Sequence, residues 1–181
     1  YQTVKITGFR TFVKKDGRVF EPFQDETTPH NMTISMNGLA LEERNDAEGL
    51  LTQVSYFTLP GERIGALVRK ERKKNIADKP VRIALLDGMP ACIPYGIDHE
   101  GMKTMGQTLK AWMQVENAGG IPYMKARAST ADSAAVTEVR GGNFSIGSLA
   151  DGTRLKAITD PKVIFSYDLS LQKPVAFLSH S

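Results

Sequence analysis

The stretch QVSYFTLPGERIGALVRKERKK, residues 53–74, predicts a β-hairpin. Residues 54–59 are mostly β-branched or aromatic, which strands favour, and apolar residues alternate again over 64–68. Pro60 and Gly61 stand between the two runs, where proline fixes φ and glycine accepts a positive φ. Since both runs carry apolar residues on both faces, at least in part, we expect the hairpin to lie inside a sheet covered by a second layer.

Short strand-like runs continue on both sides of this hairpin, separated by turn-forming pairs such as Asp16-Gly17 and Asp151-Gly152. The runs fall at residues 3–13, 19–20, 32–36, 81–86, 111–116, 123–129, 136–139, 144–146, 163–165 and 173–178. The acidic stretch 42–49 is expected to be a loop, and one short helix is expected over 102–108. Turn signals at intervals of roughly 8–12 residues are typical of an antiparallel all-β sandwich. We therefore predict a single β-sandwich unit over residues 1–181, with at most one or two short helices.

The composition is typical of a globular protein, since 41% of the 181 residues are hydrophobic and 24% are charged. No apolar run approaches the roughly 20 residues that cross a bilayer as a helix, and the first residues show no cleavable signal pattern. The single cysteine, Cys92, fits a reducing compartment. We therefore expect a cytoplasmic protein without a membrane partner.

The two ends of the sequence suggest a piece of a longer protein. The sequence starts without methionine, and the strand-like run 173–178 stops just before the last residue, Ser181. We therefore expect the β-sandwich to be a fragment of a larger enzyme.

A basic cluster at residues 69–74 has five positive charges in six residues, which would suit nucleic acid. However, no aromatic side chain that stacks on a base is interleaved with it. Lysine and arginine also protect the exposed edge of a sheet, and the net charge of the chain is only +3. We interpret the cluster as a solvated strand end and expect no nucleic-acid partner.

Motifs for catalysis or metal binding are few. His30, His99 and His180 are scattered, without the HExxH spacing or a close pair of ligands, so no metal site is expected. Cys92 has the apolar neighbours of a small buried hydrophobe rather than those of a nucleophile. Gly141-Gly142 lacks the lysine and Ser/Thr of a phosphate-binding loop, and we interpret it as a hairpin turn.

Carboxylates are the remaining candidates for acid–base chemistry on a glycoside, which needs two carboxyls across a bond or one carboxyl with a phosphate nucleophile. The candidates are Asp87, Asp98, Glu100, Asp132 and Asp168. Spacing does not show which of them meet, and each is explained more simply by a turn or by local hydrogen bonds to backbone amides. Trp112 is suited to stack on a sugar ring, but in an alternating strand a tryptophan is more often a core residue. These patterns assign no catalytic residue.

Five groups of residues, in this order, resemble one family of large bacterial enzymes. They are SYFTLP with GALVRK (55–60 and 65–70), LLDGMP with IPYG (85–90 and 93–96), TLKAWM (108–113), IPYMKARAST (121–130) and DLSLQKP (168–174). Together they are similar to the N-terminal β-sandwich region of glycoside hydrolase family 94 phosphorylases. The branch they resemble is that of 1,2-β-oligoglucan phosphorylase, often labelled cellobiose-phosphorylase-like. The resemblance covers most of residues 31–178 and depends on the order of the groups.

This resemblance implies a supersandwich of antiparallel strands, galactose-mutarotase-like, joined to a helical (α/α)6 barrel. In such glycosyltransferases of carbohydrate metabolism, inorganic phosphate is the co-substrate and attacks the anomeric carbon of a β-glucoside with inversion. An aspartic acid protonates the departing oxygen, and α-glucose 1-phosphate is released. No other cofactor is implied. The acid and the phosphate-binding residues belong to the barrel, and this sequence has no run of amphipathic helices that would form one.

The resemblance therefore implies a non-catalytic domain. Its expected partners are the catalytic helical barrel of the same protein, an oligosaccharide, and a second copy in a homodimer. No catalytic residue is carried over to any position of this sequence.

Two other functions fit the same residues. A free-standing carbohydrate-binding module would show exposed aromatics on one face, with Tyr56, Trp112 and Tyr123 as candidates, and a structural or oligomerisation domain would bind no sugar. If residues of this chain border a sugar, we expect them on the irregular loop 87–101 and on the loop 129–133, because binding residues favour loops on a rigid scaffold. The predicted carbohydrate-binding residues are Trp112, Tyr95, Asp98 and Asp132.

Overall fold

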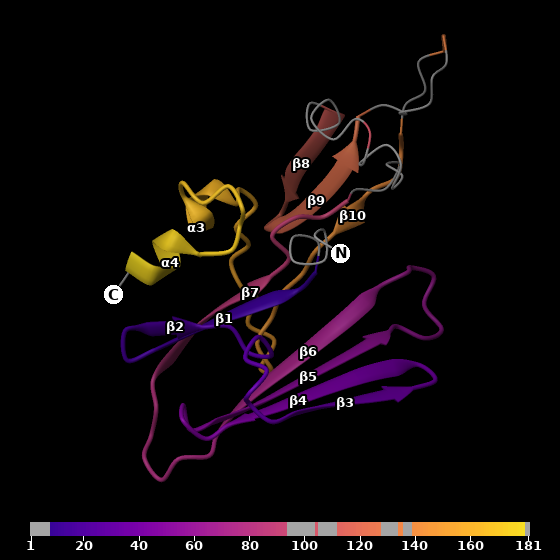
Figure 1. Cartoon of the computed structure of the whole chain (residues 1–181). Coiled ribbons are helices and arrows are strands. Elements are labelled where there is room, and N and C mark those ends of the chain that lie inside the picture. Colours follow the sequence, from indigo (N-terminus) through magenta and orange to yellow (C-terminus); the bar gives the residue numbers. More distant parts are fainter. Residues whose placement is uncertain (1–7, 94–103, 105–111, 128–133, 136–138, 180–181) are drawn as a thin grey trace. The chain divides into compact units, whose positions relative to one another are not determined.

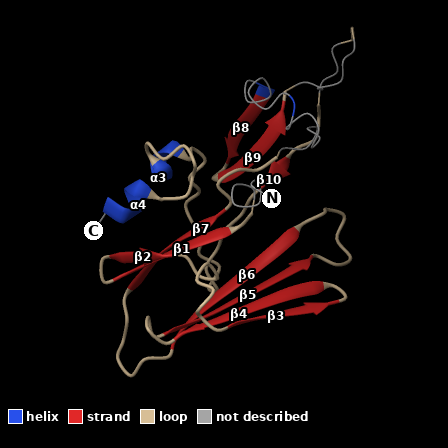
Figure 2. Cartoon of the chain, viewed as in Figure 1, coloured by secondary structure: helices blue, strands red, loops and turns tan. Residues whose placement is uncertain are grey.

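Antiparallel strands are the main regular secondary structure of the computed structural model, with two short helices among the residues that it describes (Figures 1 and 2). These residues are 8–93, 104, 112–127, 134–135 and 139–179. The helix expected over 102–108 and the strand expected over 136–139 lie almost entirely outside them. The predicted all-β fold class is confirmed. The chain divides into two compact units, formed chiefly by Arg10–Gly88 and by Met89–Ser179, while the single sandwich over residues 1–181 stays a prediction.

The unit Arg10–Gly88 contains two antiparallel sheets. Its strands are β1 (Arg10–Lys15), β2 (Arg18–Phe20), β3 (His30–Ser35), β4 (Gly38–Asn45), β5 (Leu50–Thr58), β6 (Leu67–Asn75) and β7 (Ile83–Gly88). One sheet has the strand order β2-β1-β7 and the other has the order β3-β4-β5-β6. The buried apolar side chains come from β1 and β5, and they are Phe12, Val13, Leu50 and Val54. Successive side chains of a strand point to opposite faces, so burial of both Phe12 and Val13 shows that β1 is covered on both sides.

The predicted central hairpin is present as β5 and β6, which pair antiparallel from Thr58↔Leu67 to Leu50↔Asn75. Its second strand starts later than expected, at Leu67, and it contains the basic residues 69–74 instead of ending before them. The connection is wider than a tight turn, since the Leu59 N–H donates to the Ala66 carbonyl at 3.1 Å. Because β6 is an outer strand of its sheet, only the β5 half of the hairpin lies inside the sheet as expected.

The first predicted hairpin is also confirmed. Asp16 and Gly17 join β1 to β2 with φ values of 50° and 79°. A type I′ turn needs positive φ at both of its central residues, which aspartate and glycine tolerate better than most residues do. A two-residue sequence signal is therefore sufficient to predict this turn.

The prediction of a loop over residues 42–49 is wrong for 42–45, because β4 continues through Asn45, and it is confirmed for 46–49, which form the turn before β5. The acidic side chains of β4 have partners. Gln53 Nε2 on β5 donates to Glu42 Oε2 at 2.7 Å, and the backbone N–H of Phe23 donates to the buried carboxylate of Glu43. Such tertiary contacts outweigh the low strand propensity of glutamate.

The unit Met89–Ser179 contains a smaller sheet. Its strands are β8 (Met113–Ala118), β9 (Ile121–Ala126) and β10 (Asn143–Phe144), in the order β10-β9-β8. The predicted strand pair of residues 111–116 and 123–129 is confirmed as β8 and β9, joined by Gly119 and Gly120 with positive φ. Ala126 is fully buried in this unit, and the side chains packed against it are Ile93, Trp112, Met113 and Val139.

The two strands predicted near the end of the sequence are wrong. Helices α3 (Lys162–Phe165) and α4 (Val175–Ser179) occupy the runs 163–165 and 173–178 instead. Local hydrogen bonds favour the helical turn of α3, because the Lys162 N–H donates to Asp160 Oδ1 at 2.9 Å. A short apolar run alone does not distinguish a strand from a helical turn.

Candidate functional site

A concentration of buried charge lies on one face of β6. Residues 69–74 alternate across this strand, so Arg69, Glu71 and Lys73 share a face while the residues between them lie on the other. The three side chains are only 8%, 12% and 6% exposed, whereas the residues between them are exposed. The interpretation of this run as a solvated strand end is therefore right for one face of β6 and wrong for the other.

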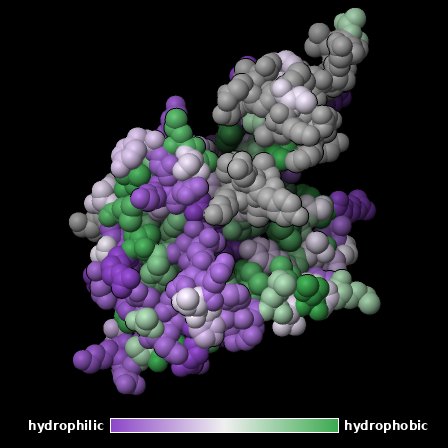
Figure 3. Space-filling model, viewed as in Figure 1, coloured by the Kyte–Doolittle hydropathy of each residue, from purple (hydrophilic) through white to green (hydrophobic). Residues whose placement is uncertain are grey.

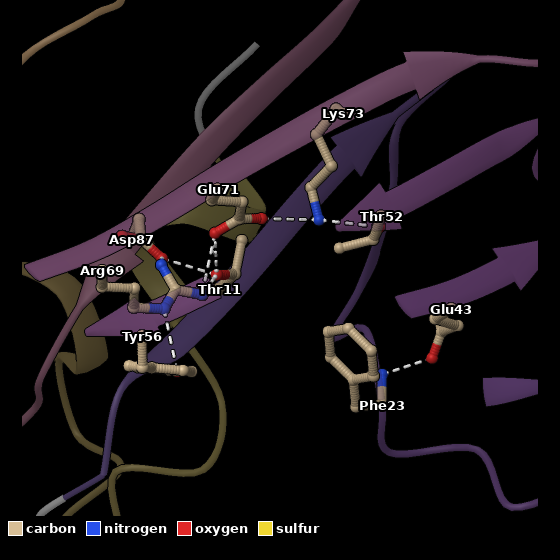
Figure 4. A network of polar contacts seen from close by, with 9 residues as sticks. All are labelled: Thr11, Phe23, Glu43, Thr52, Tyr56, Arg69, Glu71, Lys73 and Asp87. Atoms are coloured by element: carbon tan, nitrogen blue, oxygen red, sulfur yellow. Dashed lines mark hydrogen bonds and ion pairs between the residues drawn. The ribbon is translucent and has the colours of Figure 1, made fainter. Parts of the chain in front are cut away.

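Arg69 lies at the centre of this site (Figure 4). Its Nη1 is 2.6 Å from Asp87 Oδ1, and its Nη2 is 2.8 Å from Glu71 Oε2. Nη2 also donates to Thr11 Oγ1 at 2.8 Å, and Nε donates to the Tyr56 hydroxyl at 3.0 Å. Side chains from β1, β5, β6 and β7 thus fix the guanidinium. We define the charged cluster as Thr11, Arg69, Glu71, Lys73 and Asp87.

Thr11 connects the charged cluster to the other sheet of the same unit. This residue is buried on β1, and its Oγ1 lies 2.7 Å from Glu71 Oε2 and 2.5 Å from Asp87 Oδ1. A hydroxyl has one proton to donate, so Thr11 donates to one of these carboxylates at a time while it accepts from Arg69. Since β1 and β7 belong to one sheet and β6 to the other, these contacts join the two sheets.

Lys73 occupies the other end of the charged cluster. Its Nζ lies 2.7 Å from Glu71 Oε1 and donates to Thr52 Oγ1 at 3.0 Å. The Glu71 Oε1 atom is buried, and the ammonium group of Lys73 is its contact. Glu43 pairs with Thr52 in the register of β4 and β5 and adds a buried negative charge near this end. Both ends of the cluster therefore have opposite charges close together.

Burial and ion pairing act against each other on these groups. Burial raises the pKa of Asp87, and the contacts with Thr11 and Arg69 offset this only in part. Burial also lowers the pKa of Lys73, although Glu71 opposes it. At Glu71 burial favours a higher pKa, but Lys73, Thr11 and Arg69 outweigh it and hold the pKa below its ordinary value. At Arg69 burial favours a lower pKa, but Asp87 and Glu71 outweigh it and raise the pKa.

The charged cluster balances its charge within the protein, since two cations, Arg69 and Lys73, face two carboxylates, Glu71 and Asp87. Two carboxyls that act on a glycoside must face each other across the bond of a substrate. Here the Thr11 hydroxyl and the Arg69 guanidinium each contact both carboxylates. This geometry suits a structural clamp, because removal of one partner from a buried ion pair leaves an uncompensated charge.

The sequence predicts a turn at Asp87, whereas the structure places this residue in β7 with its carboxylate in the charged cluster. The sequence did not identify Thr11, Arg69, Glu71 and Lys73 as members of a site. A signal for three of them was present, because alternate residues of a strand share a face and Arg69, Glu71 and Lys73 alternate. Thr11 had no comparable signal, since its role depends on how the two sheets pack.

Of the four predicted carbohydrate-binding residues, Trp112 is the one that lies among the described residues. Trp112 is half-buried and packs against Ala126, which corresponds to the core alternative that the sequence left open. Tyr95, Asp98 and Asp132 lie outside the described residues, as does the acid–base candidate Glu100. Their role in binding a sugar stays a prediction.

Asp168 and Cys92 have local environments that account for them. The Ser170 hydroxyl and the backbone N–H groups of Lys173, Ser170 and Gln172 donate to the Asp168 carboxylate, and they lower its pKa to about 2. Cys92 is half-buried, and burial raises the pKa of its thiol, which disfavours the nucleophilic thiolate. Both observations fit a structural role.

In the part of the chain that the structure describes, no group of three or more His, Cys, Asp or Glu residues is arranged to hold a metal ion. None of the helices described has the length and apolar character needed to cross a membrane. No family model matches the chain, and no curated protein matches it either.

Proposed function

We propose that this chain is a non-catalytic β-sandwich domain of a carbohydrate-active enzyme that phosphorolyses β-glucosides. The parent reaction would convert 1,2-β-oligoglucan and phosphate to α-glucose 1-phosphate and an oligoglucan that is one glucose unit shorter. The observation that carries the proposal is the charged cluster, whose buried ionisable groups contact one another and join two sheets. Such an arrangement suits a scaffold, because a reacting site needs groups that are left for the substrate.

Two further observations support this assignment. The five groups of residues that resemble family 94 phosphorylases supply the enzyme class, and their order along the chain is that of the family. The antiparallel sheets of the described residues are compatible with the sandwich that the resemblance implies. In this proposal the acid and the phosphate site belong to a helical barrel of the same cytoplasmic protein, so phosphate is a co-substrate of the parent enzyme.

A domain replacement tests the proposal. This chain is fused to the helical barrel of a 1,2-β-oligoglucan phosphorylase in place of that enzyme's own sandwich, and release of α-glucose 1-phosphate from β-1,2-gluco-oligosaccharides and phosphate is measured. We expect the fusion to be active and the chain alone to be inactive. A matched pair of fusions, Arg69→Ala and Arg72→Ala, is expected to lose and to keep activity respectively, because only Arg69 belongs to the charged cluster. A folded fusion without activity contradicts the proposal.

Calorimetry distinguishes the alternative function, a free-standing carbohydrate-binding module, from the proposed non-catalytic domain. Of its aromatic candidates, Tyr56 is half-buried and its hydroxyl accepts a hydrogen bond from Arg69, and Trp112 packs against Ala126. We therefore expect no binding of β-1,2- or β-1,4-gluco-oligosaccharides by the folded chain. Binding that Trp112→Ala abolishes and Trp112→Phe retains would instead identify a binding module with a stacking platform.

A further inference from the structure

The outer strand β3 lacks the features that usually protect the edge of a sheet. All six residues of His30–Ser35 are exposed, and none of them is Lys, Arg, Asp, Glu or Pro. On one side β3 pairs with β4, and within the described residues no strand pairs with its other side. Natural sheets place charges, proline or bulges on such edges, because free N–H and C=O groups are a template for another strand.

The register of β3 and β4 identifies which backbone groups are free. The turn between the two strands has two residues, so Ser35 and Gly38 form the first hydrogen-bonded pair. The Arg44 N–H donates to the Pro29 carbonyl at 3.1 Å, which continues the same alternation. The backbone groups that point away from the sheet therefore belong to His30, Met32 and Ile34.

The side chains of this edge form an apolar surface on one face. Met32 is 62% exposed and Ile34 is 71% exposed, and Met36 in the adjoining turn is fully exposed. Figure 3 shows hydrophobic surface in green over the end of the β3–β4 hairpin. Exposed apolar surface beside free backbone groups marks a site of protein association.

The charges on the two outer strands of this sheet indicate which strand can pair with β3. The opposite edge of the same sheet, β6, carries five positive charges and one negative charge over residues 69–74, so it resists pairing with another strand. An uncharged β3 meets no repulsion from its own copy. We propose that β3 pairs antiparallel with β3 of a second copy of this chain. Pairing of like edges forms a closed dimer, whereas pairing of β3 with β6 would form an open filament.

The pairing register follows from the side chains. A two-fold axis at Thr33 places Met32 opposite Ile34 of the second copy on one face, and Asn31 opposite Ser35 on the other. In these two pairs apolar residues contact apolar residues and polar residues contact polar residues, as favourable cross-strand pairs require, while His30 lies opposite Met36 at each end. The same register pairs the outward backbone groups of Met32 with those of Ile34, so the backbone and the side chains favour one alignment.

Sedimentation velocity of the whole chain tests the dimer. The natural chain is expected to form, as its concentration rises, a species of twice the 19.9 kDa chain mass. Thr33→Lys and Thr33→Glu each place two like charges opposite each other at the two-fold axis, and each is expected to weaken the dimer about fivefold or more. An equal mixture of the two variants is expected to dimerise again, because lysine then faces glutamate.

Two controls accompany these variants. Thr33→Gln changes the size of the side chain without adding charge, and Lys70→Glu reverses a charge on the opposite edge, so both are expected to keep the dimer. Circular dichroism verifies that each variant folds. The proposal is overturned if the natural chain stays monomeric at every concentration, or if Thr33→Lys dimerises as tightly as the natural chain.

Discussion

The two outer strands of the β3-β4-β5-β6 sheet differ in where they carry charge. On β6, residues 69–74 are all charged, and three of them are buried in the charged cluster that reaches β1 and β7. On β3, no residue is Lys, Arg, Asp or Glu, and all six residues are exposed. Both strands are edges of one sheet, so edge position alone does not explain the difference. The charged side chains of β6 join the two sheets and protect this edge from pairing with another strand. The outward backbone groups of β3 stay available to another strand.

Arg69→Ala is expected to have the largest effect on stability. It leaves Glu71 and Asp87 without the guanidinium that contacts both, and loss of one partner of a buried ion pair costs about 3–5 kcal/mol. We expect the lower end of that range, because the Asp87 side chain is 38% exposed and Lys73 still contacts Glu71. Urea unfolding followed by circular dichroism measures the change. The matched control is Arg72→Ala on the exposed face of β6, which is expected to change the free energy of unfolding by less than about 0.5 kcal/mol. Equal effects of the two variants would contradict a clamp at Arg69.

Thr11→Val is expected to have the next largest effect. Valine keeps the shape of the side chain but removes the hydroxyl that contacts Glu71, Asp87 and Arg69, so buried polar groups lose a partner at a cost of about 1–3 kcal/mol. The control is Thr33→Val on β3, where the side chain is exposed. The free energy of unfolding of both variants is measured at a concentration where the chain is monomeric. We expect a loss of stability for Thr11→Val and none for Thr33→Val.

The pH dependence of stability tests Glu71 more finely. Its pKa in the folded protein lies below the ordinary value of 4.5, so its ionised form contributes stability that is complete above pH 4.5 and is lost as the pH falls through the lower pKa. Asp87 acts in the opposite sense, because its pKa is raised on folding. We therefore expect Glu71→Gln to lose less stability than the natural chain between about pH 5 and about pH 3. The free energy of unfolding of both proteins is measured in urea at each pH. If it falls equally for the two proteins as the pH falls, Glu71 is not held in its ionised form.

The smallest expected effect on folding is that of a charge placed on β3. Thr33→Lys should change the free energy of unfolding of the monomer by less than about 0.5 kcal/mol, because the side chain is exposed. The same variant is expected to weaken the dimer, which sharpens the contrast with Arg69→Ala. A large loss of monomer stability would show that β3 is needed within the chain and not between copies.

Several parts of the fold could be predicted because local residues determine them. Asp16-Gly17 and Gly119-Gly120 supply the positive φ that their turns need, and the strands beside them follow from alternating apolar residues. The errors have two different causes. β4 is a strand because Glu42 and Glu43 find partners on other segments. The error at α3 is local, because a short apolar run does not distinguish a strand from a helical turn, and Asp160 binds the start of this turn.

The site was harder to predict than the fold. The charge alternation of β6 was visible in the sequence, but whether its inner residues are buried depends on the packing of β1 and β7 against them. Residues 69–74 were therefore interpreted by composition as a solvated end, although their period of two also indicated a shared face. Thr11 could not be predicted, because a single threonine has no pattern of its own and its role depends on how the two sheets pack.

A double-mutant cycle across the two sheets tests the central claim, that the charged cluster is a structural clamp, most directly. The free energy of unfolding is measured for Arg69→Ala, for Asp87→Ala, for the double variant and for the natural chain. We expect a coupling energy of about 1 kcal/mol or more, because the two side chains are 2.6 Å apart, although the Asp87 side chain is 38% exposed and solvent screens part of the interaction. Additive effects, with a coupling energy of zero within error, would contradict the clamp.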